Sequence, residues 1–466
     1  MQKIIIFFEK FDFYLWNSFL IYLLLGVGIY LTFRLKGMQI RYLFTSLKLA
    51  FTRSDNKAKG DISQFQSLMT ALAATIGIGS IAGMATAVVA GGFGAIFWMW
   101  VVAFVGMAAK YAEAILAVKY RITDKKNKMA GGPMYYIHRG LNLKWLGATF
   151  AVFGMFASFA GGNLIQAQSI SDALFELTNL SPYISGVIIA VLSGVVILGG
   201  IKSLGKVNAY LVPIMAMIYI TGGLAIIIIK YKYILGGLAL IVKSAFTMKA
   251  AGGGLIGTGI MSAIQMGIAR GISSNEAGLG SAPIASAAAK TDLPGRQGLI
   301  SMSGVFLSSF IVCTITVLVL SVTNVVGLEV ASGELLNGAP LVMRAFSSII
   351  PFGEHIVATG LVLFGFSTIL GWSYYGEKCF EFLFKEKYLI YFRVVFIMVI
   401  FLGAISSIKL VWPLADIMNG FMAIPNLIGL FLLANVVVEE SDIFLNVLKK
   451  EKLSLKKIKQ KDFEIN

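Results

Sequence analysis

The chain has 466 residues, of which 58% are hydrophobic and 13% are charged, and its formal net charge is +16. Soluble domains carry about 25% charged residues, so this composition excludes an ordinary soluble fold and indicates a polytopic membrane protein. The basic residues lie between apolar runs, where they orient a membrane protein, so no nucleic-acid partner is expected.

Eleven apolar runs approach or exceed the roughly 20 residues that a helix needs to cross a bilayer. Glu9 and Asp12 precede the first run and no small-residue cleavage site follows it, which argues against a signal peptide. The runs lie near residues 14–34, 66–90, 93–119, 148–175, 183–200, 208–229, 254–289 (interrupted), 298–324, 353–383, 389–408 and 413–438.

The distribution of positive charge predicts the orientation of the chain. Alternate loops hold 29 of the 39 Lys and Arg residues. Basic loops stay in the cytoplasm, so we expect a multi-pass protein of the cell membrane with its N terminus outside and its C terminus inside. Four lysines fall on the other side, in a stretch that we expect to be an external surface helix: Lys230, Lys232, Lys243 and Lys249.

No enzyme active site can be assembled from the sequence. Cys313 and Cys379 lie in separate apolar runs, and His138 and His355 have no potential partners nearby in the chain. A Ser/His/Asp set, zinc-ligand spacing and a phosphate-binding loop are all missing, so we expect neither catalysis nor a cofactor.

Apart from the first run, the apolar runs form two sets of five, and each set begins with a run interrupted by glycine. The first reads "QFQSLMTALAATIGIGSIAGMATAVVAGG" from Gln64, and the second contains "GIARGISSNEAGLGSAP" at 267–283. Paired interrupted spans of this kind are a pointer to a transporter binding site. The predicted units are an N-terminal helix with a basic loop (1–60), two five-helix repeats (61–230 and 254–438), an external segment (231–253) and a basic tail in contact with anionic lipid (439–466).

Unwound backbone within a membrane needs partners for its N–H and C=O groups, which a ligand can supply. A half-helix that starts there presents N–H groups suited to an anion, and one that ends there presents carbonyls suited to a cation. We expect Gly267, Gly271, Gly278 and Gly280 to allow the second interruption. The alternative is that small residues such as those at 79 and 83 serve close helix packing.

Four motifs carry a resemblance to a known family: "TALAATIGIGSIAGMATA" (70–87), "GGPMYYI" (131–137), "GNLIQAQ" (162–168) and "GISSNEAGLGSAPIASAAAKT" (271–291). In this order they resemble the alanine or glycine:cation symporter family, over residues 60–435. The resemblance implies an all-α membrane protein of the leucine-transporter (LeuT) architecture. That architecture has two inverted repeats of five helices, each with a discontinuous first helix, and this family adds one N-terminal helix to give about 11 in total.

The resemblance also implies symport of a small neutral amino acid with sodium. Two residues depart from the common family pattern, which has Asn at the positions of Ser80 and Gln168. In the leucine-transporter pattern the position of Ser80 contributes to one of two sodium sites. We therefore predict a single sodium site here.

Carried onto this sequence, the resemblance places the substrate site at the first interruption. The N–H groups of Gly77 and Gly79 are expected to bind the substrate carboxylate, because only glycine allows so close an approach. The ammonium group is expected at the carbonyl of Thr75 and at polar groups of the second interruption. Further predicted substrate residues are Ser273, Ser274, Asn275 and Gln166, although Gln166 could equally be a buried bridge between helices.

The sodium site is expected where the first interrupted helix meets the run at 353–383. Sodium prefers oxygen ligands, which the hydroxyls of Ser367 and Thr368 can supply. Backbone carbonyls of Ala73, Ile76 and Phe364 complete the expected ligands. In the alternative interpretation these two hydroxyls only bond to carbonyls one turn earlier in their own helix.

Trp372 follows Thr368 by one helical turn, so its indole is expected to restrict the pocket to a substrate the size of alanine or glycine. The alternative role for Trp372 is an interfacial anchor. Glu276 and Arg270 are ionisable groups at membrane depth, where such groups are costly and usually paired. Glu276 is expected to brace the second interruption, with direct binding of substrate or sodium as the alternative, and Arg270 to pair with an acidic gate residue or face a vestibule.

The sequence thus predicts a sodium-coupled importer of alanine or glycine that works by alternating access. A proton-coupled transporter on the same fold is one alternative, with Glu276 as its titratable group. A channel or membrane receptor is the other, and the paired interrupted spans argue against it.

Overall fold

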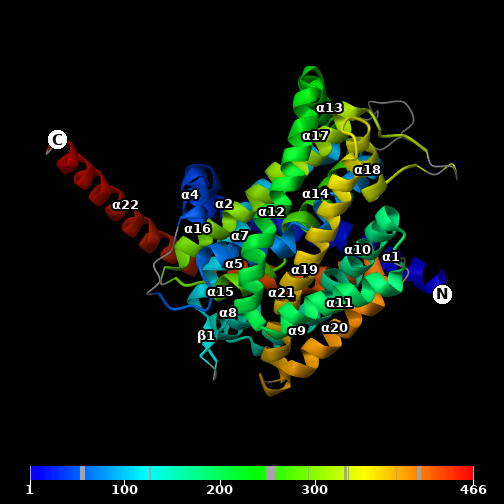
Figure 1. Ribbon diagram of the computed structural model, residues 1–466. Helices are drawn as coiled ribbons and strands as arrows, with labels where there is room; N and C mark the ends of the chain where they lie inside the picture. Colours follow the sequence, from blue (N-terminus) through cyan, green and yellow to red (C-terminus); the bar gives the residue numbers. More distant parts are fainter. Residues whose placement is uncertain are drawn as a thin grey trace.

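The computed structural model is built almost wholly of α-helices (Figure 1). It describes residues 2–52, 58–124, 127–247, 259–291, 293–329, 333, 335–384, 386–406 and 411–464. The first half comprises α1 (Gln2–Leu15), α2 (Ile21–Arg34), α3 (Met38–Arg41), α4 (Leu43–Phe51), α5 (Gln64–Thr75), α6 (Ala82–Gly91), α7 (Gly94–Lys119), α8 (Pro133–Leu141), α9 (Lys144–Phe159), α10 (Ile165–Thr178), α11 (Pro182–Leu198), α12 (Gly200–Ile229) and α13 (Ile234–Ser244).

The second half comprises α14 (Ile260–Asn275), α15 (Ala282–Ala287), α16 (Pro294–Val305), α17 (Thr314–Thr323), α18 (Gly338–Ser347), α19 (Gly353–Phe384), α20 (Leu389–Ile405), α21 (Val411–Leu432) and α22 (Ala434–Glu464). A two-stranded antiparallel hairpin, β1 (Ile122–Thr123) and β2 (Met129–Ala130), follows α7. Short π-helical segments join α1 to α2, α9 to α10 and α16 to α17, at Trp16–Leu20, Ala160–Leu164 and Phe306–Cys313. Single 3-10 turns lie at Ile78–Ser80, Tyr231–Tyr233 and Glu386–Tyr388.

Among the described residues, every apolar run predicted from the sequence contains helix. Within the described residues, seven helical stretches are long and apolar enough to cross a membrane. They are 94–119, 144–178, 200–229, 294–323, 353–384, 386–405 and 411–432. Large apolar side chains on α11, α12 and α20 face outward, as expected where lipid rather than water surrounds the protein.

The first interruption lies between α5 and α6. α5 ends at Thr75, Ile76 and Gly77 leave the helical conformation, and α6 resumes at Ala82 after the turn Ile78–Ser80. Ser63 starts α5 with a capping box, in which its hydroxyl accepts from the N–H of Gln66. Residues 76–81 are called the first break below.

The second interruption lies between α14 and α15. Glu276 adopts a left-handed conformation with φ of 52°, and Gly278 and Gly280 both have φ of 84°. Glycine adopts positive φ at little steric cost, so these two residues let the chain turn out of the helix. Residues 276–281 are called the second break below.

The expectation that four glycines open the second interruption is wrong for two of them. Gly267 and Gly271 lie inside α14, where a methyl group on Gly271 would come within 2.7 Å of Val102 and one on Gly267 would overlap the carbonyl of Ala95. Both contacts are with α7, so these glycines bring two helices together, which is the packing role of small residues in membranes.

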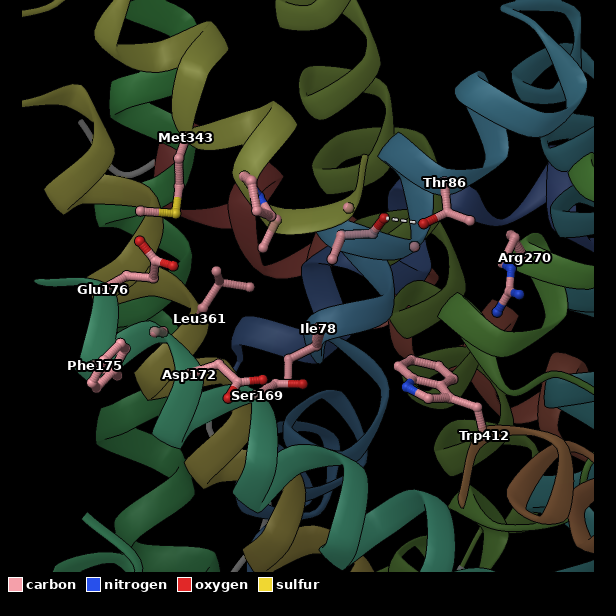
Figure 2. A pocket seen from close by; sticks show the side chains of 16 residues that line it. Ile78, Thr86, Ser169, Asp172, Phe175, Glu176, Arg270, Met343, Leu361 and Trp412 are labelled. Atoms are coloured by element: carbon pink, nitrogen blue, oxygen red, sulfur yellow. Dashed lines mark hydrogen bonds between the residues drawn. The ribbon is translucent and has the colours of Figure 1, made fainter. Parts of the chain in front are cut away.

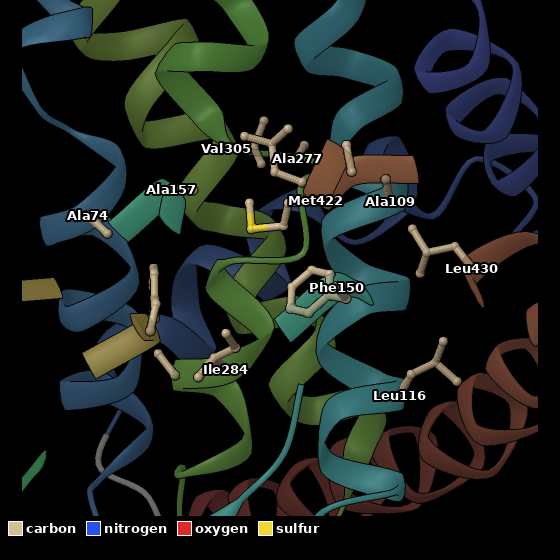
Figure 3. Packing of buried hydrophobic residues seen from close by; sticks show 14 of the residues in the cluster. Ala74, Ala109, Leu116, Phe150, Ala157, Ala277, Ile284, Val305, Met422 and Leu430 are labelled. Atoms are coloured by element: carbon tan, nitrogen blue, oxygen red, sulfur yellow. The ribbon is translucent and has the colours of Figure 1, made fainter. Parts of the chain in front are cut away.

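α7 lies at the centre of the molecule, in contact with α2, α14, α15 and α16. Figure 3 shows part of the hydrophobic core, to which Ala109 and Leu116 of α7, Phe150 of α9 and Ile284 of α15 all belong. The core therefore joins helices of both halves around the two breaks. α22 extends away from this body (Figure 1).

α13 occupies the place where an external surface helix is expected, and Lys243 lies in its last turn. Lys249 lies outside the described residues. α13 and α18 lie at one end of the molecule and the β1–β2 hairpin at the other (Figure 1).

Candidate functional site

Four of the five residues predicted to bind sodium converge beside the first break. The hydroxyl of Thr368 on α19 donates to the carbonyl oxygens of Ala73 at 2.9 Å and of Phe364 at 2.8 Å. The hydroxyl of Ser367 lies 2.9 Å from the same Phe364 oxygen and 3.4 Å from that of Ala73. Two hydroxyl and two carbonyl oxygens thus meet between α5 and α19, and Ile76 is the residue directly after the end of α5.

These contacts include the back-bonding that the alternative interpretation predicted, since both hydroxyls reach Phe364 within α19. The contacts with Ala73 are not back-bonding, because they join α19 to α5, two helices that lie far apart in the sequence. Hard oxygen atoms grouped in this way are the ligand type that an alkali cation prefers.

Gly77 lies between Thr368 and Gln166. A methyl group on Gly77 would come within 2.7 Å of the Thr368 hydroxyl and 3.6 Å of Oε1 of Gln166. Gln166 Nε2 donates to the carbonyl of Gly161 at 3.0 Å, in the π-helical segment before α10. Its Oε1 is buried and has no hydrogen-bond partner among the described residues, so an unused acceptor faces the first break.

The two breaks are joined by hydroxyl groups. Ser80 Oγ lies 3.1 Å from Ser274 Oγ, which in turn lies 2.9 Å from the thiol of Cys313. Thr316 on α17 donates to the carbonyl of Ser80 at 3.0 Å. The position of Ser80, where the common family pattern has Asn, is therefore filled by a serine that bonds to the last turn of α14.

The three polar residues at the end of α14 have different surroundings. Asn275 donates to Ser309 at 3.2 Å and accepts from the N–H of Ala277 at 2.9 Å, so its side chain is used within the protein. Ser274 is likewise engaged. Ser273 is exposed, and a methyl group on Gly79 would lie 3.9 Å from its hydroxyl. Among these three, Ser273 is the residue whose side chain is open to a ligand.

Thr75 is buried, and its hydroxyl donates to the carbonyl of Ala71 at 2.6 Å, one turn earlier in α5. Thr75 is the last residue of α5, so its carbonyl, the group predicted to receive the substrate ammonium, lies at the end of the helix. The last carbonyls of a helix lack intrahelical donors, so they attract positive charge.

Glu276 is buried, and protein donors engage both of its carboxylate oxygens. Oε1 accepts from the indole N–H of Trp372 at 3.1 Å, and Oε2 accepts from the hydroxyl of Ser281 at 2.6 Å. Glu276 thus ties the second break to α19, in the arrangement that a bracing role requires.

Trp372 is only 4% exposed, which does not fit an anchor at the membrane surface. A methyl group on Gly162 would overlap with Trp372, so the indole side chain packs directly on the π-helical segment that precedes Gln166. Its ring also meets that of Tyr375 edge-on, with centroids 5.6 Å apart. Trp372 therefore links the surroundings of both breaks.

Sequence reasoning missed a buried group of polar residues behind the second break. Lys110 on α7 donates to the carbonyl oxygens of Asn275 and Glu276, at 3.0 and 3.2 Å. One turn later, Glu113 accepts from the N–H of Gly280 at 3.1 Å and from Asn426 on α21 at 2.7 Å. The presence of Lys and Glu three residues apart inside an apolar run was the available signal, because such residues in a membrane span are costly and usually functional.

A cavity of about 550 Å³ opens beside the first break, toward the end of the molecule that carries α18. Figure 2 shows Ile78 at this cavity, with Asp172 and Glu176 of α10 on one side and Arg270 of α14 with Trp412 on the other. Two carboxylates and one guanidinium therefore lie on the wall of this cavity.

Arg270 also lines a second cavity of about 210 Å³, between α1, α14 and α21. Its positive charge interacts there with Asp12 of α1 and Asp416 of α21. Ser273 and Asn419 line the same cavity. Arg270 thus lines both cavities, and its predicted role as a gate residue stays a prediction.

The family of the chain follows from comparisons with known proteins. The model of the sodium:alanine symporter family matches residues 1–459. The chain belongs to this family. The sodium/alanine symporter AgcS of Methanococcus maripaludis is 53% identical over 444 residues, which cover 94% of this chain and 96% of AgcS. The probable sodium/glutamine symporter GlnT of Bacillus subtilis is 38% identical, over 91% of this chain and 87% of GlnT.

The fold is shared with solved transporters. A crystal structure of MhsT in complex with L-phenylalanine matches 82% of this chain and 93% of MhsT, with a TM-score of 0.57 and 14% sequence identity. This likeness shows the leucine-transporter fold. The chain is therefore a multi-pass membrane transporter of a sodium-coupled symporter family, and not an enzyme.

In this family member, hydrogen bonds join the two broken helices at the end of the molecule opposite the larger cavity. The guanidinium of Arg121 donates to the carbonyl oxygens of Ala287 at 2.9 Å and Ala289 at 2.7 Å, and also to those of Lys59 and Thr291. The N–H groups of Asp61 and Ile62 both donate to the carbonyl of Ala288. These bonds join the segment before α5 to the segment after α15, so the far ends of the two broken helices are held together.

Proposed function

We propose that the protein is a sodium-coupled symporter of alanine or glycine that moves its substrate into the cytoplasm by alternating access. The convergence of Ser367, Thr368 and the carbonyls of Ala73 and Phe364 at the first break carries this proposal. Family membership supports sodium as the coupling ion.

Sodium is proposed to bind between α5 and α19. In its absence the two hydroxyls donate to carbonyls, and when sodium arrives they turn their lone pairs toward it, which a rotating hydroxyl allows. Ala73, Ile76 and Phe364 contribute carbonyl oxygens. This ion then fixes the end of α5 against α19 and so holds Gly77 in place.

The substrate is proposed to lie at the first break next to Gly77. Its carboxylate meets the N–H groups of Gly77 and Gly79, and its ammonium meets the carbonyl of Thr75 and the hydroxyl of Ser273. Gln166 supports this position because its free Oε1 faces Gly77 and can accept a hydrogen bond from the ammonium. Ser274 and Asn275 shape the site from behind, since their side chains bond within the protein.

A small substrate is favoured by the side chains that surround the site. Trp372 is packed on Gly162 and bonded to Glu276, so its indole cannot swing aside without breaking both contacts. Alanine or glycine therefore fits better than a larger amino acid such as glutamine, which appears in the name of one relative.

The cavity beside α18 and the Arg121 hydrogen bonds at the other end support an outward-facing state, with α18 outside and the β1–β2 hairpin in the cytoplasm. This agrees with the orientation predicted from the loop charges. Alternating access then requires the Arg121 contacts to break while the vestibule closes. The two five-helix repeats (61–230 and 254–438) are the proposed moving parts.

The deciding experiment is uptake of labelled alanine and glycine into proteoliposomes, with and without an inward sodium gradient. Saturable uptake that requires sodium and is inhibited by unlabelled alanine is expected. Uptake driven by a pH gradient without sodium would establish the proton-coupled alternative instead, and non-saturable flux would establish a channel. Competition by unlabelled glutamine tests the substrate size.

A further inference from the structure

A lysine inside the protein core holds the end of α14. Lys110 is only 2% exposed, and its Nζ donates to the carbonyl oxygens of Asn275 at 3.0 Å and Glu276 at 3.2 Å. These are the last residue of α14 and the residue that caps it. The end of a helix carries unpaired carbonyls and partial negative charge, so an ammonium group is stabilising there.

Two carboxylates add negative charge around the same ammonium. Glu113 and Glu276 both interact electrostatically with Lys110. Glu113 holds the N–H of Gly280 and the amide of Asn426, and Glu276 holds Ser281 and Trp372. Lys110 therefore fixes the start of the second break directly, and the two carboxylates beside it fix the end of the break.

A helix end with unpaired carbonyls and partial negative charge also exists at the first break. There α5 ends shortly after Ala73, and α19 supplies Ser367 and Thr368. There the proposed cation comes from solution. At the second break the cation is covalently attached to α7. A buried charge that served only to fill space would be costly, since an apolar side chain of similar volume packs without desolvation.

We infer that Lys110 is a built-in cation, whose ammonium group takes the place of a second coupling ion at the second break. This inference deepens the proposed sodium symport and rests on it. Lys110 is a positioning residue: it acts by holding Asn275 and Glu276 in the conformation that presents Ser273 and Ser274 to the first break. The cycle then couples to one sodium ion, because the second cation never leaves.

The first test measures cation binding without transport. In Lys110→Ala the atoms removed beyond Cβ correspond to n-propylammonium, so this ion can refill the vacated space. We expect n-propylammonium chloride to raise the melting temperature of detergent-purified Lys110→Ala, and not that of wild type. The control is Lys119→Ala, which removes a lysine from the end of the same helix where it is half-exposed and pairs with Glu440. A folded Lys110→Ala protein that responds to n-propylammonium no more than the control does would overturn the inference.

The second test uses uptake in proteoliposomes. Wild type is expected to show a sodium Hill coefficient near one. In Lys110→Ala we expect uptake to fall at least about tenfold, which corresponds to about 1.4 kcal/mol. We expect uptake to recover when n-propylammonium is added, or at high sodium concentration with a Hill coefficient above that of wild type. Unchanged uptake and unchanged sodium dependence in this variant would contradict a built-in cation.

A comparison of Lys110→Met with Lys110→Arg separates charge from shape if the alanine variant does not fold. Methionine keeps most of the volume without the charge, whereas arginine keeps the charge. We expect Lys110→Arg to retain more uptake and a sodium Hill coefficient near one, and Lys110→Met to lose both. Equal behaviour of the two variants would show that Lys110 only fills space. Failure of the proposed function is distinguishable, because wild type itself would then show no sodium-dependent uptake while the melting experiment still reports on Lys110.

Discussion

Both breaks leave backbone N–H and C=O groups that need partners, and the two breaks are surrounded by different kinds of side chain. The first break is lined by glycine, hydroxyl groups and carbonyls, and one of its acceptors, Oε1 of Gln166, is unused. The second break is surrounded by Lys110, Glu113 and Glu276, whose charged groups bond to its backbone and to its neighbours. The first break thus has free groups that can bind ligands, whereas at the second break the charged side chains of the protein take the place of ligands.

This difference separates two roles within one transporter. A site that binds and releases its cargo must leave groups free in one state and use them in another. A brace must keep the same bonds throughout, and buried charged hydrogen bonds are strong enough to do so. Substitutions at the first break are therefore expected to change ligand dependence, and substitutions at the second break to change stability first.

The largest effect is expected from Gly77→Ala at the first break. A methyl group there would come within 2.7 Å of the Thr368 hydroxyl, so the substitution intrudes on both proposed ligand sites at once. We expect sodium-dependent alanine uptake to be abolished while the protein still folds. The control is Gly26→Ala on α2, where no atom lies within 4 Å of the new methyl group. Comparable uptake by the two variants would refute a substrate site next to Gly77.

Thr368→Ala is expected to have the next largest effect. It removes a hydroxyl that meets the carbonyl of Ala73 and that is proposed to bind sodium, and losing a contact with a charged partner costs about 1.5–3 kcal/mol. The sodium concentration for half-maximal uptake should rise at least about tenfold, with Thr368→Ser close to wild type. Sodium titration at saturating alanine measures this. An unaltered sodium requirement would leave Thr368 with back-bonding inside α19 as its only role.

Trp372→Ala tests the side chain that connects the two breaks. It removes the indole that is proposed to restrict the site, together with the donor to Glu276. We expect alanine uptake to fall by about tenfold, which corresponds to about 1.4 kcal/mol, and unlabelled leucine or glutamine to become effective competitors. Trp372→Phe is the matched control, because it keeps most of the ring while losing the N–H donor. Substrate preference that stays the same in both variants would remove Trp372 from the site.

The sequence predicted the first break more completely than the second. Local pattern was sufficient for Gly77, because glycine, a hydroxyl pair on another span and the family motifs all pointed to one place. The second break depends on Lys110, Glu113 and Asn426, which lie far from it in the chain, and a single sequence does not show which spans meet. Gly267 and Gly271 were misread for the same reason, since their contact with α7 appears only after the helices are packed.

The smallest effect on transport is expected from Glu276→Gln, and this variant decides between brace and ligand. Glutamine can still accept from Trp372 and bond to Ser281, so the second break should keep its shape while losing one negative charge. We expect a lower melting temperature and an uptake rate reduced by only about two- to threefold, with unchanged half-saturation for alanine and sodium, since a hydrogen bond is typically worth about 0.5–1.5 kcal/mol. If Glu276 instead bound the substrate ammonium, half-saturation for alanine would rise strongly while the melting temperature stayed constant. Measuring both quantities on one preparation therefore separates the two roles, and it shows whether charge at the second break acts on the protein or on its cargo.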